Sequence, residues 1–212
     1  MSFSPSQNLQ LEERPALVPP KERPFFAETW DRTTACVLDG AMCAMMYALQ
    51  RRHRLDAGSR STLERYVREF ESASRPAFFA FTPPSSLEGG PTAPHLRWLS
   101  PISSTFPQND HLHVDLYPSS RGWSAPTVLF LHALMSASDT GYRRWAAKFN
   151  ARGWNACFIH LPFHYSRTPS GHFNGELAIT ADLVRSAKGL RQGVIELRQL
   201  IDTLRGWGCR EF

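Results

Sequence analysis

Three potential metal ligands alternate in one short stretch of the sequence: His111, His113 and Asp115. Alternate residues of a β-strand point to the same face, and imidazole nitrogens and carboxylate oxygens are donors that zinc accepts. His160 and His164 could add further ligands. One strand supplies fewer ligands than the closed set that a zinc site requires, and short motifs of this kind often occur without a metal. We therefore predict that these residues hold no metal, and we expect no other cofactor.

Serine chemistry is the second possibility that the residue types raise. A nucleophilic serine on an α/β sheet stands in a Gly-x-Ser-x-Gly turn between a strand and a helix, and the sequence contains no such motif. Ser136, Ser138 and Ser166 follow candidate strands but lack this context. We interpret them as loop serines that hydrogen-bond to nearby backbone.

Charge and composition exclude several classes of protein. The net charge of +5 arises from 24 Lys and Arg against 19 Asp and Glu, and acidic residues interrupt the arginines along the chain. Proteins that bind nucleic acid usually gather positive charge on one face, so we predict no nucleic-acid partner. The longest apolar stretch, residues 35–49, contains Asp39 and is shorter than the roughly 20 residues of a membrane span.

The cysteines and the N-terminal residues indicate the cellular compartment in which the protein is expected. The four cysteines have neither C-x-x-C spacing nor the density of a disulfide scaffold. Residues 1–14 are polar and lack the apolar segment of a secretory signal. We therefore expect a soluble, cytoplasmic protein.

Composition and periodicity divide the chain into four parts. Residues 1–24 are rich in Pro and Ser and predict a flexible arm. Residues 25–75 carry apolar side chains at helical spacing, interrupted at Gly58, and predict a helical N-terminal segment. Residues 76–94 form a connector rich in Pro, Gly and Ser, and residues 95–212 carry the strand patterns.

The third and fourth strand candidates predict a parallel pair. Strands are predicted over residues 95–100 and 111–117, and in the second apolar residues alternate with polar ones, which predicts a half-exposed strand. Residues 127–131 and 155–159 are continuously apolar, as in strands buried on both faces. A helix over residues 142–149 lies between them, so we predict a strand–helix–strand crossover and two adjacent parallel strands.

The clearest helical pattern occupies residues 180–205. Its apolar residues step by threes and fours and predict one continuous stripe. Asp182 near the start and Arg205 near the end suit the helix dipole. The stripe comprises Leu183, Ala187, Leu190, Val194, Leu197, Ile201 and Leu204.

Residues 125–167 resemble the α/β-hydrolase superfamily, in particular a divergent esterase or lipase-like member. In that family the third strand ends in His-Gly, and here the strand of residues 127–131 runs into His132-Ala133. The following helix, with Tyr142-Arg143-Arg144-Trp145-Ala146, and the Arg152-Gly153-Trp154 turn are similar to the family pattern. The family motif Asp-x-Pro-Gly-His-Gly-x-Ser after the fourth strand is matched in part by His160-Leu161-Pro162-Phe163-His164-Tyr165-Ser166-Arg167.

The resemblance implies an α/β fold. The expected architecture is a partial α/β-hydrolase sheet, mostly parallel with antiparallel N-terminal strands, and a helical N-terminal extension. Residues 95–212 would be the N-terminal half of the hydrolase domain, truncated before the segment that carries the catalytic serine.

The resemblance also implies the site residues. A backbone N–H of Leu134 or Met135 would belong to the oxyanion hole, and His132 would orient that loop. His164, Tyr165 and Arg167 would bind substrate beyond the end of a parallel strand. The complete protein would be a serine hydrolase whose partner is a small acyl ester.

Other functions stay open at this point. We expect this chain alone to be inactive, because it carries no nucleophile motif. It could instead be a non-catalytic or truncated binding module, or a metal-dependent hydrolase that uses His111 and His113. Self-association through an exposed sheet edge is also expected, because an unpaired apolar strand pairs readily with another chain.

Overall fold

The computed structural model describes residues 25–55, 60–134 and 136–212. The chain divides into two compact units, Met1–Met45 and Met46–Phe212, and each is described by itself. The predicted arm (1–24), the break at Gly58 and the oxyanion candidate Met135 lie outside the described residues.

Helices dominate the N-terminal part, as the apolar spacing predicts. Helix α1 (Phe25–Leu55) begins in the first unit and ends in the second, and α2 (Arg60–Ser72) and α3 (Arg75–Phe78) follow. Pro76 stands in the first turn of α3, where its missing N–H breaks no helical hydrogen bond. No described helix is both long and apolar enough to cross a lipid bilayer.

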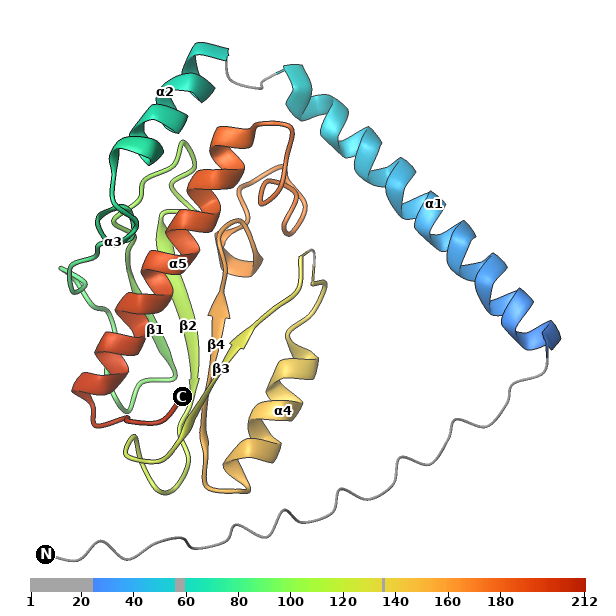
Figure 1. Cartoon of the computed structure of the whole chain (residues 1–212). Coiled ribbons are helices and arrows are strands. Elements are labelled where there is room, and N and C mark those ends of the chain that lie inside the picture. The colour runs from blue at the N-terminus through green and yellow to red at the C-terminus, as the bar shows by residue number, and fades with distance from the viewer. Residues whose placement is uncertain (1–24, 56–59, 135) are drawn as a thin grey trace, which may run out of the picture. The chain divides into compact units, whose positions relative to one another are not determined.

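The second unit contains a four-stranded mixed sheet together with helices, which confirms the general α/β class (Figure 1). The strands β1 (His95–Leu99), β2 (His111–Tyr117), β3 (Thr127–Leu131) and β4 (Asn155–His160) lie in the order β1-β2-β4-β3. β3 pairs with β4 in parallel, as predicted. The expectation of a mostly parallel sheet is wrong for the described strands, because β2 runs antiparallel to both of its neighbours.

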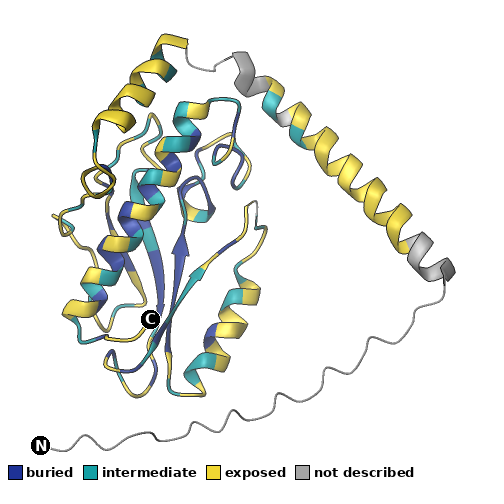
Figure 2. Cartoon of the chain, in the orientation of Figure 1, coloured by how far each residue is buried: buried dark blue, intermediate teal, exposed yellow. Residues whose placement is uncertain are grey.

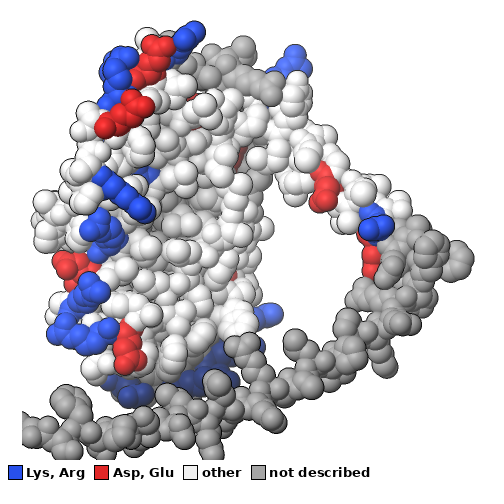
Figure 3. Space-filling model, in the orientation of Figure 1, with Lys and Arg blue, Asp and Glu red and all other residues white. Residues whose placement is uncertain are grey.

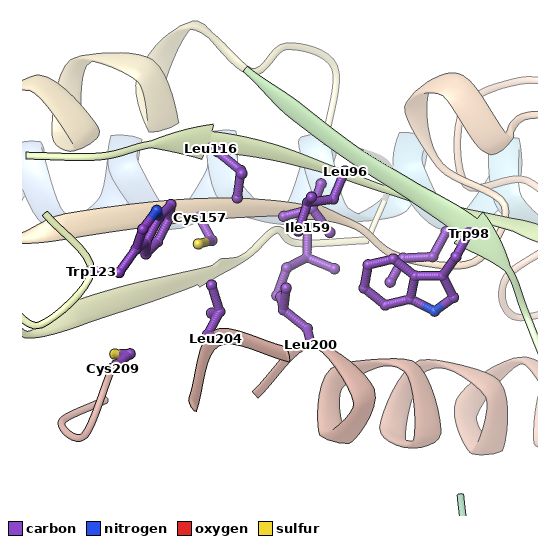
Figure 4. Close-up of a cluster of buried hydrophobic side chains, with 11 residues drawn as sticks. Leu96, Trp98, Leu116, Trp123, Cys157, Ile159, Leu200, Leu204 and Cys209 are labelled. Carbon is purple, nitrogen blue, oxygen red and sulfur yellow. The ribbon is translucent and has the colours of Figure 1, made fainter. Parts of the chain in front are cut away.

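One face of the sheet packs against α5 (Leu183–Gly206), which runs in front of the strands in Figure 1. Figure 4 shows side chains of the helix and the strands pointing toward one another in this core. Its buried members are Leu96, Trp98, Leu112, Val114, Leu116, Trp123, Cys157, Ile159, Leu200, Leu204 and Cys209.

The opposite face receives α4 (Thr140–Asn150) over its inner strands. The Tyr142 ring stacks on Phe158 of β4 at 4.7 Å between ring centroids and lies 6.0 Å from Phe130 of β3. The register places His160 and His113 opposite each other, and Asp115 opposite His95, on this same face beyond α4.

β3 is not buried on both faces, contrary to the prediction. Its central residues are half-buried and Leu131 is 50% exposed, whereas every residue of β4 is buried. The reason is position, because β3 is the last strand in the sheet order and β4 is an inner strand (Figure 2). At its start, the N–H of Thr127 donates to the carbonyl of Glu211 at 3.0 Å.

β2 is half-exposed on its polar side, as predicted, except at Asp115. Its residue Asp115 is 7% exposed. The carboxylate is covered because His95, His113 and His160 surround it, as described below.

The apolar stripe predicted for α5 does not all face the sheet. Leu183, Leu190 and Val194 are 59%, 66% and 42% exposed. The buried face of α5 carries Ile195, Leu200 and Leu204 together with polar side chains that have partners, among them Gln192 with Asn109. On the face seen in Figure 3, Lys and Arg lie among Asp and Glu along one side, and an area without charged side chains extends toward β3.

Candidate functional site

An apolar cavity of about 290 Å³ opens where β3 and β4 end. Its walls come from the loop after β3, the loop after β4 and one side of α5. Because ligands of open α/β sheets bind beyond the carboxyl ends of the strands, this is the expected position of a ligand site. The lining residues are Leu131, His132, Leu134, Leu161, Pro162, His164, Ala178, Ile179, Gly189, Leu190, Gly193, Val194 and Leu197.

His132, at the end of β3, connects the two loops of the cavity. Its Nε2 accepts a hydrogen bond from the N–H of Leu161 at 3.1 Å, and its Nδ1 lies 3.0 Å from the carbonyl of Ala133. This pattern requires the neutral ring with its proton on Nδ1. Burial lowers the pKa of His132 to about 4, so the ring stays neutral near pH 7 and serves to hold the loop.

The loop after β3 is anchored on both sides. The N–H of Ala133 donates to the hydroxyl of Tyr142 at 3.3 Å, and the Tyr165 hydroxyl donates to Oγ of Ser136 at 2.9 Å. Leu134, the predicted oxyanion-hole residue, lines the cavity and is 45% exposed. Tyr165 therefore contacts the loop that contains Leu134, although it is not among the residues that line the cavity.

The loop after β4 has an unusual backbone. Phe163 and Tyr165 have φ of +66° and +50°, in the left-handed region that non-glycine residues rarely adopt. Hydrogen bonds hold both residues there, because the Phe163 N–H donates to Oδ1 of Asn109 at 2.8 Å and the Tyr165 N–H donates to Oδ1 of Asn174 at 2.7 Å. Each such residue costs about 1–3 kcal/mol, so the surrounding contacts must outweigh that cost.

His164 lies between these two residues and lines the cavity. Its Nδ1 is 2.8 Å from the carbonyl of Pro162, and its ring centroid is 4.4 Å from that of His132. Burial lowers the pKa of His164, and the nearby Arg167 charge adds to the effect. The cavity therefore contains two neutral imidazoles within an apolar wall.

Arg167 is fully buried and does not line the cavity. Its guanidinium donates to both carboxylate oxygens of Glu196 on α5, at 2.7 and 2.9 Å, and also to the carbonyls of Asn109 and His160. Such a bidentate pair fixes the position of both partners. In this structure Arg167 joins the loop after β4 to α5 and to the segment before β2.

A second polar cluster surrounds the buried Asp115. It lies on the same face of the sheet as α4, opposite the face that packs against α5. Nδ1 of His95 and Nε2 of His113 are 2.8 and 3.1 Å from Oδ1 of Asp115, and Nε2 of His160 is 3.5 Å from Oδ2. Burial alone raises the pKa of this carboxyl, but the hydrogen bonds from His113 and His95 and the nearby His160 ring together outweigh burial and lower the pKa well below its usual range. His111 stands apart, with its Nδ1 3.3 Å from the carbonyl of Pro107.

Several of these residues were not among the sequence candidates. His95 lies on β1, sixteen positions before the His111 motif, and only the strand register brings it to Asp115. Asn109 and Glu196 had no motif to mark them, although a buried carboxylate on a helix face that contacts a sheet implies a buried cation as its partner.

No protein-family model matches the chain, and no curated protein matches it. The resemblance to α/β-hydrolases therefore depends on the sequence motifs alone.

Proposed function

We propose that this chain is the acyl-binding part of a serine-hydrolase-like α/β protein, whose cavity accepts the acyl group of a small ester. The observation that carries the proposal is the apolar cavity of about 290 Å³ beside Leu134, at the carboxyl ends of β3 and β4. This volume is near the lower end of ligand pockets, about 300–1,000 Å³, which favours a short acyl chain.

The backbone of the loop after β4 supports the resemblance. The two glycines of the hydrolase motif fall on Phe163 and Tyr165, and these residues have the positive φ that normally calls for glycine. The loop thus keeps a glycine conformation without glycine. The antiparallel pairing of β1 and β2 ahead of the parallel β3–β4 pair also agrees with the sheet expected of that family.

In this function the residues of the chain would bind and orient the ester, and none of them would act as the nucleophile. The acyl chain would lie against Leu190, Val194 and Leu197 of α5. The backbone N–H of Leu134 would donate to the oxygen that becomes negatively charged during acyl transfer, an interaction worth about 3–4 kcal/mol in other hydrolases. His132 would keep that loop in place through its bond to Leu161.

A non-catalytic binding module is the second candidate. It is favoured by the absence of Gly-x-Ser-x-Gly from the 212 residues and by the two occupied ring nitrogens of His132. We expect no hydrolysis of p-nitrophenyl esters and no labelling by a fluorophosphonate by this chain. Labelling of a serine in it would contradict this expectation.

Ligand binding tests the proposal directly. We expect methyl hexanoate to give saturation-transfer NMR signals with the wild-type chain and to lose them with Gly193→Leu, because the added side chain extends from a cavity-lining position. Gly206→Leu is the matched control, since Gly206 lies on the same helix in open space and outside the cavity. Absence of binding to the wild type, or equal binding to both variants, would contradict an acyl site.

A further inference from the structure

Three neighbouring strands bring potential metal ligands together on the face of the sheet opposite α5. β1 contributes His95, β2 contributes His113 and Asp115, and β4 contributes His160. One ligand atom each from His95, His113 and Asp115 lies within 4.8 Å of the others. The sequence analysis predicted no metal because one strand supplies too few ligands, and it named His160 only as a possible addition. The register brings His160 to this cluster and adds His95 from β1.

The separations between the donor atoms suit a single small cation. In tetrahedral zinc the bonds to nitrogen and oxygen are about 2.0–2.2 Å, which places neighbouring donors roughly 3.3–3.5 Å apart. The three imidazole nitrogens lie 2.8, 3.1 and 3.5 Å from the oxygens of Asp115. These imidazole–carboxylate separations are close to that spacing. The nitrogens of His95 and His113 lie within 4.8 Å of each other, so the imidazole side chains would rotate toward one another when an ion binds.

His160 gives independent support for a ligand at this position. Its Nε2 is buried, has no hydrogen-bond partner and faces Asp115, and its side chain is only 10% exposed. Its other nitrogen, Nδ1, lies 2.8 Å from Oγ of Ser166. With the Nδ1 proton donated to that hydroxyl, Nε2 presents a lone pair toward the cluster, which is how metal-bound histidines are commonly held.

We propose that His95 Nδ1, His113 Nε2, His160 Nε2 and the Asp115 carboxylate form a Zn²⁺ site. Three imidazoles and one carboxylate suit zinc better than Mg²⁺ or Ca²⁺, which prefer oxygen ligands. Solvent reaches the site because His95 is 56% exposed and His113 is 25% exposed in their side chains.

The proposed site is structural. Four protein ligands complete a tetrahedron and leave no position for an activated water, which distinguishes structural from catalytic zinc. The ion would tie β1, β2 and β4 together on the side of the sheet that α5 does not cover. The site is separate from the apolar cavity, whose lining includes none of the four ligands.

Zinc titration of the untagged full chain tests the proposal. Cys36 and Cys43 are exposed free thiols and should first be changed to serine, because thiolates also bind zinc. We expect one equivalent of Zn²⁺ to bind and to raise the melting temperature, with no such rise from Mg²⁺. Co²⁺ in its place should show the intense visible absorption of tetrahedral rather than octahedral coordination.

Two histidine variants separate this site from non-specific binding. His95→Ala removes a largely exposed ligand with little risk to folding, and we expect it to weaken zinc binding by about a hundredfold or more, since even outer-shell changes cost 10–100-fold. His111→Ala is the matched control from the same face of the sheet and should leave binding unchanged. Three results would overturn the proposal. They are no stoichiometric zinc binding by the chain with all four proposed ligands, an octahedral Co²⁺ spectrum, and an equal loss of zinc binding in the two histidine variants.

Discussion

His132 makes the stability of the fold depend on pH. The pKa of His132 is about 4 in the folded chain against an ordinary value of 6.5. Between these two pH values the ring is protonated in the unfolded chain and neutral in the folded chain. Its contribution is therefore fully present above pH 6.5 and is lost as the pH falls toward 4, to a total of about 3 kcal/mol. His164 acts in the same direction. Urea unfolding between pH 7.5 and 4.5 should show this decline.

The variant His132→Gln identifies the group responsible. It removes the titrating ring while keeping a polar side chain at the end of β3, so the free energy of unfolding should be lower at pH 7.5 but should decline less steeply with acid. An unchanged slope in the variant would assign the pH dependence to other groups.

The ion pair of Arg167 and Glu196 supplies a second residue-level prediction. Both side chains are 1% exposed, so Arg167→Met leaves an unpaired buried carboxylate. We expect the variant to lose about 3–5 kcal/mol in chemical denaturation. Arg167→Met combined with Glu196→Met should recover most of that loss, because neither charge then remains buried. A double variant as unstable as the single one would mean that the bonds from Arg167 to Asn109 and His160 matter more than the ion pair.

Among the elements, strands and helices were predictable where the periodicity was strong. The four strands, α4 and α5 occur within a few residues of their predicted bounds. The burial of β3 was not predictable, because a continuous apolar run does not show whether a strand lies inside a sheet or at its edge. The packing face of α5 was not predictable either, since Gln192 and Glu196 are tolerated there only through partners distant in the sequence.

Gly193 lies on the side of α5 that approaches the loop after β4. A Cβ atom there would be 3.5 Å from Cδ of Pro162, an ordinary contact distance. Gly193→Ala should therefore raise the free energy of unfolding by up to about 1 kcal/mol through helix propensity alone. Thermal melts should show the gain, whereas Gly153→Ala should destabilise, because Gly153 has φ of +75° and its Cβ would lie 2.7 Å from Arg121. If Gly193→Ala is destabilising instead, the added methyl group is not accommodated against Pro162 and this expectation is wrong.

At the scale of the whole molecule, the second unit carries two unequal sheet edges. The β1 edge is covered by reciprocal backbone bonds between Glu88 and Arg97. β3 is the other terminal strand, and Leu131 on it and Leu190 on α5 are exposed apolar side chains. We therefore predict concentration-dependent self-association in analytical ultracentrifugation, driven by the β3 side.

Charged substitutions locate the associating surface. Leu131→Lys should shift the equilibrium toward monomer, whereas Leu99→Lys, at a similarly exposed leucine on the β1 edge, should not. A wild-type monomer at all concentrations, or an equal effect of the two substitutions, would be against association through β3.

The sequence could predict one of the two candidate sites but not the other. The position of His132 and His164 at the mouth of a cavity follows from strand order and could be predicted. The cluster around Asp115 could not, because His95, His113 and His160 meet only through the registers of two antiparallel pairs. A shift of one residue in either register would turn a histidine to the opposite face.

The bond from Thr127 to Glu211 has a consequence for amide hydrogen exchange along β3. The carbonyl of Pro126 accepts from Asn155 of β4, so the amides of Thr127, Leu129 and Leu131 alternate away from β4 toward the open edge. Thr127 alone of these three has a backbone acceptor there, and its amide should exchange slowly in deuterated buffer. In the monomer, at low protein concentration, Leu129 and Leu131 should exchange within the time needed to record a first spectrum, so one β-strand would contain both protected and unprotected amides.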